Sequence, residues 1–99
     1  MKKILGVLEG CFGSITPAEA AQNMTSTLQL LRSLTHGNIT IEEAETFEDA
    51  RRKLAYYVSG DTVIFNSCSM IEAARAIKKQ FPYIKVVVIT SAIPLKEII

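Results

Sequence analysis

The chain has 99 residues, of which 48% are hydrophobic and 21% are charged. This composition lies outside the range of disordered proteins and suffices for one domain, residues 1–99, with a buried core. The net charge of +1 provides no electrostatic attraction toward nucleic acid. No apolar stretch reaches the about 20 residues that cross a bilayer, and the run Ile4–Leu8 is too short for a signal peptide. We therefore expect a cytoplasmic protein that binds neither nucleic acid nor a membrane.

The first run, Ile4–Leu8, is short and unbroken, which is typical of a strand covered on both faces. Thr16-Pro17-Ala18-Glu19 then supplies a capping box with proline in the first turn, and this pattern predicts a helix that Gly37 ends. Its apolar positions recur at helical spacing, at Ala20, Met24, Leu28, Leu31 and Leu34. Residues Ile39–Glu42 alternate instead, and they predict an edge strand with one wetter face.

A second helix is predicted from Thr46 to Ser59-Gly60, because acidic residues fill its first turn and glycine follows it. The run Val63–Phe65 predicts the third strand. A further capping box, Ser69–Glu72, opens a third helix that ends before Pro82, and Val86–Ile89 forms the fourth strand. The predicted core residues of these two helices are Phe47, Ala50, Leu54 and Val58, then Ala73, Ala74, Ile77 and Phe81.

Strands that alternate with helices pair in parallel and cross over in a right-handed sense. The predicted fold is therefore an α/β three-layer sandwich around a four-stranded parallel sheet in the order 2-1-3-4. In such sheets, ligands bind beyond the carboxyl ends of the strands.

From Ile39 onward, the sequence resembles the receiver domain of response regulators. Asp61–Asn66, with the sequence DTVIFN, stands where that family has its DLVLLD strand, and Ile71–Thr90 follows the next helix and strand nearly in step. The first forty or so residues match in element order alone. The resemblance implies a flavodoxin-like fold that lacks the fifth strand and last helix of a receiver.

The receiver chemistry does not carry over to these positions. Asn66 replaces the phosphorylated aspartate, and an amide cannot form an acyl phosphate. Leu8 and Glu9 replace the acidic pair that holds Mg²⁺, whereas Thr90 matches the switch hydroxyl and the family's conserved lysine has no counterpart. The resemblance thus implies a pseudo-receiver: a non-catalytic regulatory or interaction module, without metal or cofactor. Its partner would be an unidentified protein, bound either at the face formed by Glu9, Asn66 and Thr90 or at the surface of a dimer.

The loop between the first strand and first helix permits a second interpretation. Its glycines and hydroxyls, at Gly10, Gly13 and Ser14, either cradle an anion with backbone N–H groups or serve a tight turn. The sequence KKILGVLEGCFGSIT loosely resembles the start of the B components of the bacterial sugar phosphotransferase system, which carry a phosphorylated cysteine after their first strand. That resemblance implies a small phosphocarrier with a phosphocysteine at Cys11, so whether the chain is an enzyme stays open.

The remaining candidates concern the thiols and the last strand. Cys11 and Cys68 lack CxxC spacing and follow what would be neighbouring strands, so they form either a redox pair or two unconnected thiols. A fourth strand at the sheet edge would expose apolar surface, which either the tail Ile93–Ile99 or a second copy covers. We expect a C₂ homodimer through Val86–Ile89 and this tail.

Overall fold

The computed structural model describes residues 2–9, 17–35, 38–65 and 71–89. Strands and helices alternate along the chain, and all pairings between the strands are parallel. The seven described elements are β1 Lys2–Val7, α1 Pro17–Thr35, β2 Ile39–Ala44, α2 Phe47–Leu54, β3 Thr62–Phe65, α3 Ile71–Gln80 and β4 Lys85–Val88. The strand order is β2-β1-β3-β4, which confirms the predicted four-stranded sheet and its flavodoxin-like arrangement.

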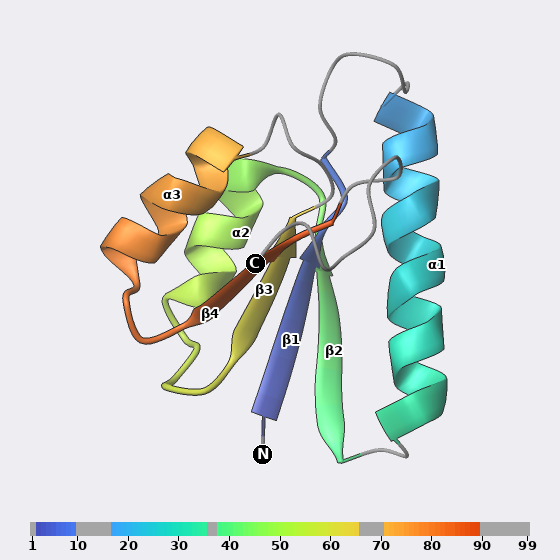
Figure 1. Ribbon diagram of the computed structural model, residues 1–99, viewed down its shortest axis with the longest axis horizontal. Coiled ribbons are helices and arrows are strands. Elements are labelled where there is room, and N and C mark those ends of the chain that lie inside the picture. The colour runs from blue at the N-terminus through green and yellow to red at the C-terminus, as the bar shows by residue number, and fades with distance from the viewer. Residues whose placement is uncertain (1, 10–16, 36–37, 66–70, 90–99) are drawn as a thin grey trace.

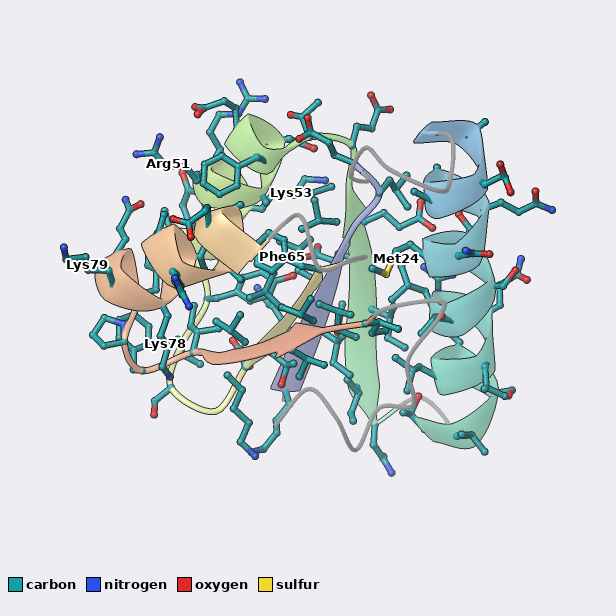
Figure 2. The ribbon with its side chains drawn as sticks, turned by 45° about the horizontal axis from the view of Figure 1, so that its top comes forward. Met24, Arg51, Lys53, Phe65, Lys78 and Lys79 are labelled. Atoms are coloured by element: carbon teal, nitrogen blue, oxygen red, sulfur yellow. The ribbon has the colours of Figure 1, made fainter. Side chains whose placement is uncertain are left out.

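The sheet lies between two helical layers, as Figure 1 shows, with α1 on one face and α2 and α3 on the other. The larger core cluster fills the space between the sheet and the α2–α3 layer, and it includes Leu5, Val63, Phe65, Leu54 and Ile77. The smaller cluster joins the sheet to α1 through Met24, Leu28 and Ile64. Met24 and Phe65 therefore mark the two sides of the sheet (Figure 2). None of the described helices is long and apolar enough to cross a bilayer.

The second helix ends earlier than the sequence predicts. Its last residue is Leu54, so the expected continuation to Ser59-Gly60 is wrong. The backbone N–H of Val58 donates to the Asp61 carboxylate at 2.8 Å instead of to a helical carbonyl. Val58 is consequently 59% exposed and does not belong to the core. The start of this helix is confirmed, because the Thr46 hydroxyl accepts the N–H of Asp49 at 3.1 Å.

The predicted core face of α1 is correct at Ala20, Met24 and Leu28 but wrong at Leu34, which is 63% exposed. The guanidinium of Arg32 donates to the carbonyl of Ile41 on β2 at 3.4 Å. Arg32 therefore reaches β2 at this end of α1, and Leu34, two residues further along the helix, points to a different face. α1 packs on β1 and β2, and Val87 on β4 is 36% exposed.

Tyr57 follows the end of α2, and its buried phenol contacts the sheet. Its hydroxyl donates to the Glu42 carboxylate at 2.6 Å, and the Lys3 ammonium lies 5.2 Å from the ring centroid. Burial is the main cause that raises the pKa of Tyr57. The hydrogen bond to Glu42 and the negative charges of Glu42 and Asp61 raise this pKa further. The folded protein thus holds the phenolic proton more tightly than the unfolded chain does.

This raised pKa predicts alkaline destabilisation that depends on Tyr57. Its contribution to stability is complete below the unfolded pKa of about 10 and is lost as the pH rises above that value. Urea denaturation at a series of alkaline pH values should show this fall in the wild type and a shallower fall in Tyr57→Phe. An equal pH dependence in the two proteins would contradict the assignment.

Candidate functional site

The carboxyl edge, defined as the edge of the sheet where the four strands end, is the first candidate site. Hydrogen bonds join neighbouring strands there: the N–H of Leu8 donates to Ala44 at 2.8 Å, and that of Ile89 donates to Phe65 at 2.8 Å. The ladder therefore brings the ends of β1 and β2 together, and those of β3 and β4. This is the edge at which parallel α/β sheets bind ligands.

Glu9 is the predicted site residue that falls within the described chain. It is exposed, and its carboxylate accepts the backbone N–H of Phe47 at 2.7 Å. Phe47 is the first residue of α2, so Glu9 satisfies one of the free N–H groups that every helix presents at its start. The anion also lies at the positive end of the helix dipole. Glu9 therefore connects the end of β1 to α2.

Further carboxylates and hydroxyls complete the start of α2. Thr46 caps the N–H of Asp49, and the Asp49 carboxylate in turn accepts the N–H of Glu45 at 3.2 Å. This backbone hydrogen bond, together with the charges of Lys53 and Arg52, lowers the pKa of Asp49. The Lys53 ammonium, 3.6 Å from that carboxylate, also donates to the Glu43 carbonyl at 2.5 Å. The polar side chains at the start of α2 are thus joined to one another and to the backbone by hydrogen bonds and an ion pair.

Leu8 precedes Glu9 just past the end of β1. It is half-buried and packs against the cluster of Met24, Leu28 and Ile64 on the α1 side of the sheet. A hydrocarbon side chain held in this cluster offers a cation no ligand. Within residues 2–9, 17–35, 38–65 and 71–89, no group of His, Cys, Asp and Glu side chains could hold a metal ion.

The other sequence-predicted site residues, Gly10, Cys11, Gly13, Ser14, Asn66 and Thr90, lie outside the described residues. So do Cys68 and the tail Ile93–Ile99. No protein-family model, curated protein or solved structure matches this chain at a significant level.

The capping role of Glu9 was missed by sequence reasoning, since 38 positions separate donor and acceptor in the sequence. A local pattern identifies a cap such as Thr46, which lies next to its helix. A cap such as Glu9, which comes from the end of a distant strand, can be recognised once the sheet places that strand end at the start of the helix.

Replacing Glu9 by alanine should lower the free energy of unfolding by about 1 kcal/mol, the usual loss for a helix cap. Glu9→Gln should lose less, because its amide oxygen can still accept the N–H of Phe47. Glu45→Ala is the matched control, since the described contact of Glu45 to Asp49 uses its backbone N–H. Urea denaturation would contradict this role if Glu9→Ala and Glu45→Ala were equally stable.

Proposed function

We propose that this chain is a non-catalytic regulatory or protein-interaction module of pseudo-receiver type, acting in the cytoplasm through the carboxyl edge of its sheet. The observation that carries the proposal concerns the two positions of the acidic pair: Leu8 offers no oxygen ligand and packs against the α1-side cluster, and the remaining carboxylate, that of Glu9, caps α2. A carboxylate fixed on a helix N–H contributes to structure. Asn66, the residue after the end of β3, lacks the nucleophilic carboxylate of a receiver.

Phosphorylation distinguishes this proposal from its alternative. We would incubate the whole chain with Mg²⁺ and acetyl phosphate, and separately with the phosphorylated phosphocarrier protein of a sugar phosphotransferase system, and then measure its intact mass. The proposal expects no phosphoryl adduct in either reaction. An adduct that survives Cys11→Ser but disappears in Asn66→Ala would contradict it directly.

The alternative is a small phosphocarrier with a phosphocysteine at Cys11. The four parallel strands and the long α1, which starts at Pro17 after the Cys11 loop, are compatible with it. In that case, the phosphocarrier reaction gives an adduct that Cys11→Ser abolishes and Cys68→Ser, the matched control, retains. An adduct of this kind would replace the first proposal with the second.

The proposed module forms a homodimer through the Val86–Ile89 edge and the tail Ile93–Ile99. Support comes from the position of β4 at one side of the described sheet and from the 36% exposure of Val87. The N–H groups of Lys85 and Ile89 donate to the carbonyls of Asp61 and Phe65, so the alternating ladder directs the backbone of Val86 and Val88 outward. Such a strand edge pairs readily with another chain.

Size-exclusion chromatography with light scattering tests the dimer. The wild type should have twice the monomer mass at high micromolar concentration, and Val87→Lys should shift it toward the monomer. Leu34→Lys, which places the same charge on α1, should leave the dimer intact. A wild-type protein that remains monomeric at this concentration would contradict the homodimer.

A further inference from the structure

The amino edge of the sheet, opposite the carboxyl edge, is formed by two hydrogen-bonded turns. In the first turn, the N–H of Asp61 donates to the Val58 carbonyl at 3.0 Å, and Gly60 adopts a φ of 92°. In the second turn, the N–H of Ile84 donates to the Phe81 carbonyl at 3.1 Å. The N–H of Gly60 then donates to the Tyr83 carbonyl at 3.4 Å, so the turns lie side by side (Figure 1).

Buried and charged groups hold both turns in place. The Asp61 carboxylate, in a residue that is 1% exposed, accepts the N–H groups of Lys3 and Val58 at 2.9 and 2.8 Å. The Lys78 ammonium donates to the carbonyls of Pro82 and Ile84, each at 3.0 Å. Lys78 and its neighbour Lys79 lie at the end of α3 that leads into the second turn (Figure 2). This anchoring makes the turns a preorganised surface.

Large apolar side chains in these turns, and in the segment just before the first turn, are exposed to solvent. Tyr56 is 81% exposed, Val58 is 59% exposed and Tyr83 is 46% exposed. The Tyr83 ring meets Phe81 edge to face with centroids 6.4 Å apart, which restricts its rotation. We call Tyr56, Val58 and Tyr83 the turn surface. Rigid, exposed tyrosines are enriched at protein interfaces because they bury a large area for little loss of side-chain entropy.

Two lysines lie at the rim of the turn surface, and the Glu42 carboxylate near it already accepts the hydroxyl of Tyr57. The Lys2 ammonium lies 3.1 Å from the point where a Cβ on Gly60 would stand, and Lys85 opens β4 directly after the second turn. The ion pairs among the described residues involve neither lysine. The acidic residues of α2 and α3 occupy the first turns of those helices, at the opposite edge. The Asp61 carboxylate is buried and already accepts its two N–H groups.

We propose that the turn surface binds an acidic protein segment that carries apolar side chains. The lysines at its rim match carboxylates, while Val58 and the two tyrosines match aliphatic or aromatic side chains. A nucleic-acid site would call for a stripe of many cations, and the chain as a whole has a net charge of +1. The turn surface lies at the opposite edge from the one invoked for the proposed function, so either proposal can fail without the other.

The probe is a short, fluorescein-labelled peptide of alternating glutamate and leucine, titrated into the intact wild-type chain. We expect saturable binding, with NMR shift changes centred on the amides of Gly60 and Tyr83. Tyr56→Ser combined with Tyr83→Ser should weaken this binding about tenfold, the loss typical of an interface hot spot. Leu30→Ser combined with Leu34→Ser is the matched control, because it removes two similarly exposed apolar side chains from α1.

A second experiment tests the lysines. The double variant Lys2→Glu with Lys85→Glu should also weaken binding of the acidic peptide, whereas Arg75→Glu on α3 should leave it unchanged. Circular dichroism checks that each variant keeps its fold. The proposal is overturned if the wild type shows no saturable binding, if the α1 control weakens binding as much as the tyrosine variant, or if a lysine–leucine peptide binds equally well. Binding of an oligodeoxythymidylate in place of the acidic peptide would equally overturn it.

Discussion

Asp61→Ala should lower the free energy of unfolding by about 3 kcal/mol. The carboxylate is 1% exposed and accepts two backbone N–H groups, one from Lys3 in β1 and one from Val58 in the preceding turn. Alanine leaves both N–H groups without their acceptor, and an unsatisfied buried donor costs about 1–3 kcal/mol. Against a typical total stability of about 5–15 kcal/mol, this loss is large.

Urea denaturation measures the effect, with two comparisons. Asp49→Ala removes an aspartate that also accepts a backbone N–H, from Glu45, but whose side chain is 24% exposed, and we expect a smaller loss of stability. Asp61→Asn should fall between the two, because one amide oxygen can still accept while the NH₂ group faces a donor. If Asp61→Ala were no less stable than Asp49→Ala, the buried carboxylate would not be the anchor of the amino edge.

Leu28→Ala should cost about 3 kcal/mol, and a second substitution should reverse part of that loss. Leu28 is fully buried between α1 and the sheet. A Cβ added to Gly6 would lie 2.6 Å from Leu28 Cδ1 and 3.0 Å from Cγ, so Gly6→Ala alone overpacks this site and should cost about 1–3 kcal/mol. In the Leu28→Ala background, the same methyl group enters the space that leucine vacated.

The double-mutant cycle should therefore show a favourable coupling on the order of 1–2 kcal/mol between Gly6→Ala and Leu28→Ala. Leu54→Ala provides the control, because Leu54 is equally buried but belongs to the cluster on the other side of the sheet. Gly6→Ala and Leu54→Ala should be additive. Additivity in the Leu28 cycle would mean that α1 does not press on β1 at Gly6.

The sequence by itself was sufficient to predict the elements and their order in the sheet. Short apolar runs marked three strands and an alternating segment marked β2, and Thr46 marked the start of α2 through a cap formed within one helical turn. Alternation of strands and helices then left few topologies, because parallel strands need crossover connections. These features depend on neighbours in the chain or on the period of the hydrophobic pattern, and both can be read along the sequence.

The tertiary structure alone decided which polar and aromatic residues do what. Glu9, predicted as part of a partner-binding face, also caps the helix that begins at Phe47, and Asp61, at the start of the predicted third strand, joins β1 to the turn before β3. Tyr56 and Tyr57 are adjacent, yet Tyr56 is 81% exposed and Tyr57 is 4% exposed. Identical residues diverge in this way because hydrogen bonds between distant segments, such as that from Tyr57 to Glu42, depend on how the strands are placed in space.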